Sequence, residues 1–94
     1  MFLQKPKFPL GQLAATPGAI EAMQDAGHLP IDFLSRHSRG DWGELSAEDI
    51  DANEMALREG FRILSAYTTA KGERLWVITE SDRSVTTILL PSEY

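Results

Sequence analysis

The hydrophobic pattern of this chain changes period near Gly60, and this switch constrains the fold most. Before it, apolar residues recur at helical spacing between helix start and stop signals. These signals predict helices near 17–26, 30–38 and 47–59. After it, β-branched and aromatic residues gather in three runs separated by turn residues, which is typical of strands joined by hairpins. The strands are predicted over Arg62–Thr68, Arg74–Glu80 and Ser84–Leu90. We expect an α+β fold: two to three N-terminal helices packed on a C-terminal three-stranded antiparallel β-meander.

The ends of the helices carry recognisable caps. Thr16 can cap the first helix with Pro17 at its first position, and Ser46 can cap the third helix, which Gly60 ends. On the third helix the spacing predicts one inward face, formed by Ala47, Ile50, Glu54 and Leu57.

A chain of 94 residues has the length of one domain. We expect 1–94 to form a single domain, with an irregular arm over 1–15, a helical part over 16–60 and the meander over 61–90. The arm is predicted to be anchored by Phe2, Phe8, Leu10 and Leu13. Both faces of the meander are partly apolar, so we expect the helices on one face and the arm or a partner on the other. The two edges of a three-stranded sheet also allow a homo-oligomer.

The acidic residues are concentrated in one segment. Between Asp41 and Glu59 seven acids stand against Arg58 alone, a net charge of −6, while the rest of the chain has eight bases against seven acids, +1. Such a segment is typical of a solvated helix face, and it can also be a surface that docks on a basic partner. The candidate binding residues are Asp41, Glu44, Glu48, Asp51 and Glu54.

Several classes of function lack their residues. The chain has no cysteine, and its two histidines do not stand at metal-ligand spacing, so we expect no metal site. Phosphate-binding glycine motifs are absent, so we expect no cofactor. No apolar stretch has the length of a membrane span and the start has no signal-peptide pattern, so we expect no membrane partner and a cytoplasmic location.

One polar cluster in the meander could carry chemistry. Arg62 opens the first strand, and Glu80, Asp82 and Arg83 lie at the second hairpin. Arginines beside a carboxylate can hold a phosphate. In the structural alternative both arginines pair with Glu80 or Asp82, and Asp82 caps its own turn.

Nearly the whole chain, residues 10–94, resembles an uncharacterised family of short bacterial proteins found on plasmids, phages and integrative elements. The resemblance is carried by Ala15-Thr16-Pro17-Gly18-Ala19, His37 with Arg39-Gly40-Asp41-Trp42-Gly43, Arg62-Ile63-Leu64-Ser65-Ala66-Tyr67, and the run from Trp76 to Pro91. It implies an origin on a mobile element and no established activity.

Residues 62–90 also resemble the C-terminal meander of barnase-like and RelE-like ribonucleases. The matching residues are Arg62-Ile63-Leu64, Trp76-Val77-Ile78, Thr79-Glu80-Ser81-Asp82-Arg83 and Thr86. The resemblance implies that Arg62 contacts the scissile phosphate. Arg83 stands where barnase-type enzymes have their catalytic histidine, and an arginine stabilises charge there but does not donate the proton. Glu80 or His37 would then have to supply the base.

Three functions follow from these observations. The first is a non-catalytic accessory protein of a mobile element that binds a protein partner through its acidic helical face, as an inhibitor of a nucleic-acid-binding or defence system. The alternative is a metal-independent ribonuclease toxin that cleaves RNA with Arg62, Arg83, Glu80 and His37. The third is a structural subunit whose interface anchors are Trp42, Trp76 and Tyr94.

Overall fold

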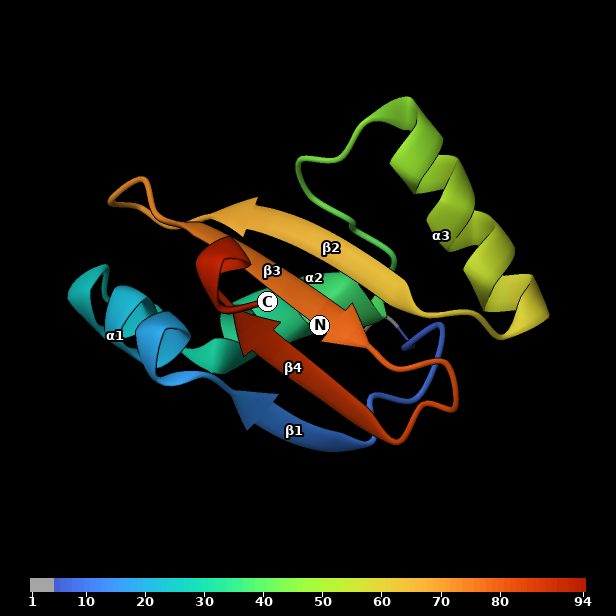
Figure 1. Ribbon diagram of the computed structural model, residues 1–94, viewed down its shortest axis with the longest axis horizontal. Helices are drawn as coiled ribbons and strands as arrows, with labels where there is room; N and C mark the ends of the chain where they lie inside the picture. Colours follow the sequence, from blue (N-terminus) through green and yellow to red (C-terminus); the bar gives the residue numbers. More distant parts are fainter. Residues whose placement is uncertain (1–4) are drawn as a thin grey trace.

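A computed structural model describes residues 5–94 and shows three helices and a four-stranded mixed sheet. The helices are α1 (Pro17–Asp25), α2 (Pro30–Ser38) and α3 (Ala47–Glu59). The strands are β1 (Gln12–Ala15), β2 (Ile63–Thr68), β3 (Arg74–Thr79) and β4 (Val85–Leu89), and a short 3₁₀ helix, η1 (Pro91–Glu93), follows. The α+β class is confirmed (Figure 1).

The predicted three-stranded meander is wrong in its strand count. The sheet has the order β1-β4-β3-β2, and β1 pairs parallel with β4 while the other pairs are antiparallel. The prediction places Gln12–Ala15 in the irregular arm because Pro6, Pro9 and Gly11 precede it as breakers. Its sequence, QLAA, also has no β-branched or aromatic residue. Tertiary pairing overrides this weak propensity: the amides of Gln12 and Thr16 donate to the carbonyls of Ser84 and Ile88, each at 2.9 Å.

The helix ends follow their capping residues. The Thr16 hydroxyl accepts a hydrogen bond from the Ala19 amide, and the Ser46 hydroxyl accepts one from the Asp49 amide. Gly60 ends α3 with a left-handed backbone, φ 78°. The three helices therefore lie within a residue of their predicted bounds.

The inward face of α3 differs from the prediction. Asn53 and Ala56 are buried, whereas Ala47 and Ile50 are exposed. The Asn53 side chain explains why α3 is rotated about its axis relative to the prediction. Its amide nitrogen donates to the Leu64 carbonyl (2.6 Å), and its oxygen accepts from the Leu64 amide (3.2 Å). A polar residue therefore faces the sheet where apolar spacing predicted otherwise.

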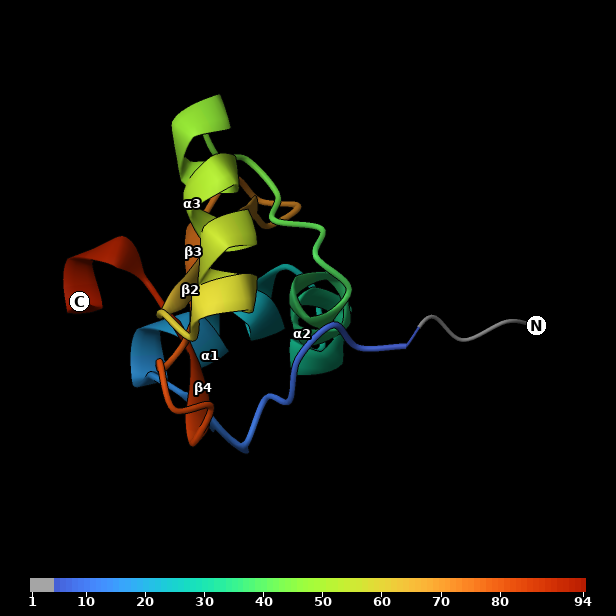
Figure 2. The same cartoon turned by 90° about the vertical axis from the view of Figure 1, so that its right-hand side faces the viewer.

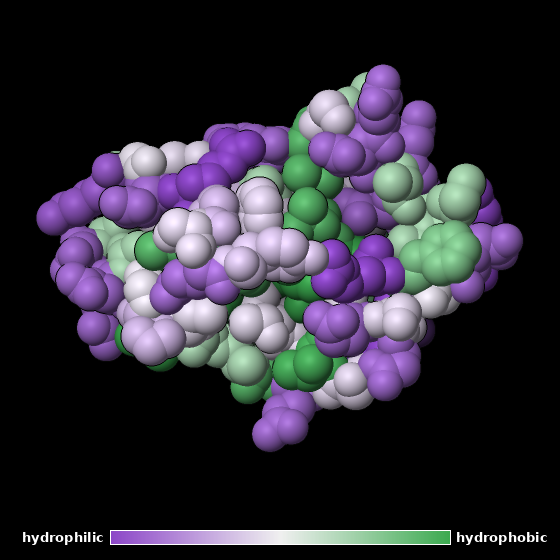
Figure 3. Space-filling model, viewed as in Figure 1, coloured by the Kyte–Doolittle hydropathy of each residue, from purple (hydrophilic) through white to green (hydrophobic). Residues whose placement is uncertain are grey.

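The N-terminal arm and α2 cover the same face of the sheet (Figure 2). Phe8 is buried and Leu10 is half-buried, as predicted, but the Leu13 side chain is 54% exposed, and Phe2 lies outside the described residues. The Phe8 ring lies edge-on to His37 of α2, with ring centroids 5.2 Å apart. Of the two alternatives for the face opposite the helices, the arm or a partner, the placement of the arm there is wrong. The opposite face carries η1 and the C-terminus instead, and apolar side chains gather along its middle (Figure 3).

The core forms two clusters on the helix-covered face. One cluster joins α1 and α2 to the sheet, and its largest members are Met23, Phe33, Leu34, Tyr67 and Leu75. The other joins the arm and α3 to the start of β2 through Phe8, Trp42, Ala56 and Ile63.

Candidate functional site

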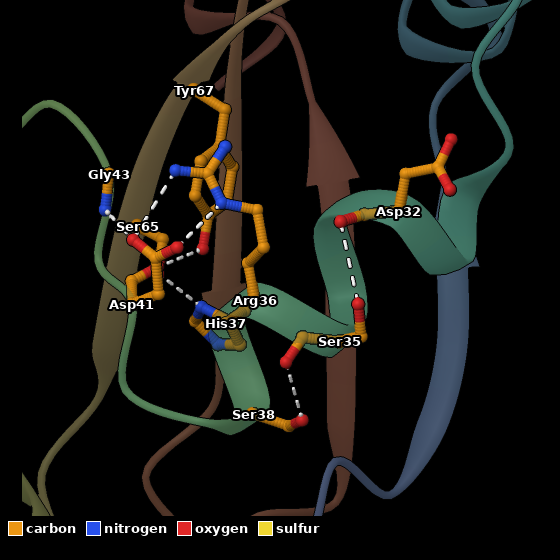
Figure 4. Close-up of polar contacts among 9 residues, drawn as sticks. All are labelled: Asp32, Ser35, Arg36, His37, Ser38, Asp41, Gly43, Ser65 and Tyr67. Atoms are coloured by element: carbon orange, nitrogen blue, oxygen red, sulfur yellow. Dashed lines mark hydrogen bonds and ion pairs between the residues drawn. The ribbon is translucent and has the colours of Figure 1, made fainter. Parts of the chain in front are cut away.

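His37 lies in the interior and belongs to a chain of buried hydrogen bonds. Its side chain is fully buried, and its Nδ1 lies 2.5 Å from the Ser65 hydroxyl (Figure 4). Its Nε2 lies 2.9 Å from the Thr79 hydroxyl. Thr79 is 2.6 Å from the Thr86 hydroxyl, which donates to the Leu10 carbonyl at 2.7 Å.

The direction of these bonds determines the tautomer of His37. The single proton of Thr86 goes to Leu10, so Thr79 must donate to Thr86 and can only accept from His37. The proton of the neutral imidazole is therefore on Nε2, and Nδ1 accepts from Ser65. Burial lowers the pKa of His37 to about 3, so the ring stays neutral in the folded protein. A fully buried, neutral histidine cannot reach a substrate.

Arg83 holds the β3–β4 hairpin against α3. Its Nη2 donates to the Ala56 carbonyl at 2.9 Å, and its Nη1 donates to the carbonyls of Phe61 (2.7 Å), Glu80 (3.1 Å) and Ser81 (3.3 Å). The carbonyl of Ala56 lies in the last turn of α3, where a cation is favourable. The guanidinium of Arg83 therefore has a structural role, because its donors bond backbone carbonyls.

The other two nuclease candidates lie apart from His37. Arg62 donates to the Tyr94 hydroxyl, and Tyr94 packs edge-on against Trp76 at 5.7 Å. Trp76 alternates with Val77 and so lies on the sheet face opposite His37. Glu80 forms no ion pair with either arginine among residues 5–94. The predicted pairing of these arginines with Glu80 or Asp82 is therefore wrong, although Asp82 does cap its turn by accepting from the Ser84 amide (2.9 Å). The sheet separates His37 from Arg62, so the four residues form no shared groove.

Three of the five predicted binding acids make contacts within the protein. Asp41 pairs with Arg36 at 2.7 Å, and this hydrogen bond holds the Asp41 pKa below its usual value (Figure 4). Glu44 accepts from Arg74 at 3.0 Å, and Glu54 accepts from the Trp42 indole at 2.9 Å. These acids stabilise the loop between α2 and α3 and its contact with the sheet.

The remaining acids lie on the outer face of α3, which we define as Glu48, Asp51, Met55, Arg58 and Glu59. At 100° per residue Asp51, Met55 and Arg58 lie on the side opposite Asn53 and Ala56, and Glu48 and Glu59 lie at the border of this side. All five are exposed, and no acid among them pairs with a cation in the described part of the chain. The exposed Met55 side chain lies between the acids. Figure 1 shows α3 at the periphery, outside β2.

The two tryptophans differ in exposure. Trp42 is 4% exposed and packs against both Phe8 and His37, so it belongs to the core rather than to a surface. Trp76 is half-buried under Tyr94. Only the Trp76–Tyr94 pair is therefore at a surface.

Several structural residues could not have been assigned from the sequence. Asn53, Ser65, Thr79 and Thr86 have polar side chains in segments whose pattern is that of a helix and three strands. Asn53 fixes α3 to Leu64, and Thr79 fixes the tautomer of His37. The sequence shows each of them only as a polar residue within the pattern of a helix or a strand.

Within residues 5–94 no helix is long and apolar enough to cross a bilayer, and no three histidine or acidic side chains are placed to share a metal ion. Comparisons of the chain with protein-family models, with curated proteins and with solved structures find no match.

Proposed function

We propose that this chain is a small accessory protein of a mobile element that acts by binding a basic protein partner through the outer face of α3. The observation that carries the proposal is the exposure of Glu48, Asp51 and Glu59 without a pairing cation in residues 5–94. The whole of α3 has five acids and one arginine, a net charge of −4.

The distribution of the other acids supports this assignment. Asp41, Glu44 and Glu54 stabilise the fold, so their presence is explained without a partner. Within residues 5–94, Glu48, Asp51 and Glu59 contribute no such contact, and unpaired charges repel each other along the helix. A cationic surface on a partner would relieve that repulsion, and the exposed Met55 would give the contact an apolar centre.

The partner's own chemistry follows from the charge. A protein surface that binds a row of acidic side chains along a helix resembles a surface that binds nucleic-acid phosphates, because both surfaces are positively charged. We therefore propose that the partner normally holds nucleic acid and that this chain competes for the same surface. Its cytoplasmic location stays a prediction.

The test is affinity capture from a nuclease-treated bacterial lysate with two charge-matched variants. One replaces Glu48, Asp51 and Glu59 with lysine, and the other replaces the exposed Glu21, Asp25 and Glu73. Each substitution adds two charges, so both variants change from −5 to +1. We expect a basic protein that binds the wild type and the second variant and is lost from the first.

The capture should also weaken at high salt, because screening reduces the attraction between exposed charges. If the α3 variant and the control variant retain the same proteins equally, the outer face of α3 is not the binding surface.

A further inference from the structure

The two edge strands of the sheet, β2 and β1, differ in whether their outward backbone groups have partners within residues 5–94. At the β2 edge, Asn53 bonds both backbone groups of Leu64, the Ala66 amide donates to the Trp42 carbonyl (3.1 Å), and the Ala66 carbonyl accepts from the Glu44 amide (2.7 Å). These contacts occupy the groups that a further strand would use. In the described part of the chain, nothing similar covers β1.

The backbone groups on the open edge of β1 follow from its pairing. The amides of Gln12 and Thr16 face β4, and a parallel ladder directs alternate residues toward the same neighbour. Leu13 and Ala15 therefore direct their N–H and C=O groups away from the sheet. An open edge with unpaired groups is a template for another strand.

A groove lies beside this edge on the face covered by α2. It has a volume of about 310 Å³ and is lined by apolar side chains of β1, α2 and β4. The residues are Leu13, Ala14, Ala15, Pro30, Leu34 and Ile88. Leu13 is 54% exposed at the rim of the groove.

From these features we infer that β1 pairs antiparallel with β1 of a second copy, across a two-fold axis at Ala14. In this register the Leu13 and Ala15 groups of the two copies exchange four hydrogen bonds, so every outward group of the two residues is used. Ala14 faces its counterpart at the closest approach of the strands, where a small side chain fits. Leu13 of each copy then lies opposite Ala15 of the other, over the partner's groove.

The lack of charge at this edge disfavours a basic partner and allows a second copy to approach. Neither β1 nor the groove has a charged side chain, although the whole chain has a net charge of −5. A cationic partner would find nothing to pair with there, whereas two like-charged copies can approach each other at an uncharged edge.

The covered β2 edge also fixes the size of the assembly. Head-to-tail growth would need a second open edge. A two-fold pairing of β1 with β1 uses the edge that residues 5–94 leave open in each copy, and it closes as a dimer. The result is a continuous eight-stranded sheet. Because α3 lies at the opposite edge, the dimer and the proposed partner do not compete, and either inference can fail alone.

Sedimentation equilibrium tests the dimer directly. At a concentration on the order of 100 μM the full chain should have twice the mass of the 10.5 kDa monomer. Leu13→Lys should raise the dimer dissociation constant at least tenfold, because it places two ammonium groups at the interface. Phe61→Lys is the matched control, since Phe61 is also 54% exposed and lies before β2, and it should leave the constant unchanged. A monomeric wild type, or equal effects of the two lysines, would overturn the inference.

Single cysteines test the register, and the absence of natural cysteine makes them specific. In Ala14→Cys the two Cα atoms would be about 4.5 Å apart, a separation that a disulfide can span, so oxidation should cross-link the dimer. Gln12→Cys is equally exposed on the same face, but four residues of offset would separate its Cα atoms by about 13 Å, and it should stay uncross-linked. Equal cross-linking of the two variants would contradict this register.

Discussion

His37 organises the packing of the fold from a fully buried position. It joins α2 to β2 and β3, and the relay continues through Thr86 to the arm at Leu10. Every buried polar atom of this relay has a partner, so the network costs little in desolvation and adds specificity to the packing.

The first prediction concerns the pH dependence of stability. The unfolded histidine takes up a proton below pH 6.5, whereas in the folded protein the pKa of His37 is about 3. The unfolded state therefore binds more protons in this window, and the free energy of unfolding should fall as the pH falls, by up to about 1.4 kcal/mol per pH unit. Urea unfolding between pH 7 and about pH 5 measures this slope above the range in which carboxylates titrate.

The matched variants for this prediction are His37→Gln and His28→Gln. Glutamine keeps hydrogen-bonding groups at position 37 without the titration, so His37→Gln should flatten the slope while His28→Gln should preserve it. The same slope in His37→Gln and the wild type would show that His37 is not its source. An NMR titration of the wild type gives a second readout, in which His37 should keep its proton on Nε2 at pH 5.

The second prediction compares how much Arg83 and Arg62 contribute to the stability of the fold. Arg83→Ala removes four hydrogen bonds from a charged donor to backbone carbonyls and should lower the free energy of unfolding by about 2 kcal/mol. Arg62→Ala loses only an exposed contact with Tyr94 and should change the free energy by less than about 1 kcal/mol. Urea unfolding of the two variants measures the difference.

The same two variants also test the ribonuclease alternative, in an expression experiment. Expression of the wild type would then degrade cellular RNA, and Arg62→Ala and Arg83→Ala would both relieve the damage. We expect intact RNA on expression of the wild type, which gel analysis of total RNA checks.

At the scale of elements, α3 is held to the sheet by a polar contact. The Asn53 side chain replaces the neighbouring strand that the β2 edge lacks at Leu64. Asn53→Ala should therefore lower the free energy of unfolding by about 2 kcal/mol and increase hydrogen exchange at the Leu64 amide. Met55→Ala, an exposed change on the same helix, should stay within about 0.5 kcal/mol. An unchanged Leu64 exchange rate in Asn53→Ala would contradict this role.

The formation of β1 depends on the glycine before it. Gly11 has φ 68°, and an added Cβ would overlap the backbone carbonyl oxygens of Arg83 and Ser84. Gly60 has a similar φ of 78°, but an added Cβ would meet no atom within 4 Å. Gly60→Ala should cost about 1 kcal/mol for the strained backbone alone. Gly11→Ala should cost about 2 kcal/mol more than Gly60→Ala in thermal or urea unfolding. Equal costs would show that β1 does not pack closely on the hairpin.

Much of this architecture was predictable because its signals are local. Thr16, Ser46 and Gly60 fix helix ends through contacts within a few residues, and period-two runs fix β2, β3 and β4. The strand β1 was not predictable, because its four residues pair only once β4 is in place. The inward face of α3 was missed for a related reason: its determinant is a bond between Asn53 and Leu64, eleven residues apart.

The candidate site was predictable only in part for the same reason. The acidity of the segment is visible in the sequence, but whether an acid is free depends on its tertiary partner. Asp41 and Glu54 are bound by Arg36 and Trp42, while Glu48 and Asp51 have no such contact in the described residues. Arg83 likewise could not be distinguished from a phosphate ligand until its carbonyl partners were known.

At the scale of the whole molecule, surface chemistry is divided between opposite edges of one sheet. The acidic outer face of α3 lies beyond β2, and the uncharged edge of β1 lies at the other end (Figure 1). This separation lets one edge bind a basic partner while the other pairs with a second copy. A dimer would then present two acidic faces and increase the avidity for a partner that has repeated basic sites.

Competition with nucleic acid is the most direct test of the proposed function. A captured basic partner is loaded with a fluorescent single-stranded oligonucleotide, and the chain is titrated in while anisotropy is measured. We predict that the wild type and the control variant at Glu21, Asp25 and Glu73 release the oligonucleotide, and that the variant at Glu48, Asp51 and Glu59 does not. An oligonucleotide that stays bound while the wild type also binds the partner would contradict the claim that α3 occupies the nucleic-acid surface.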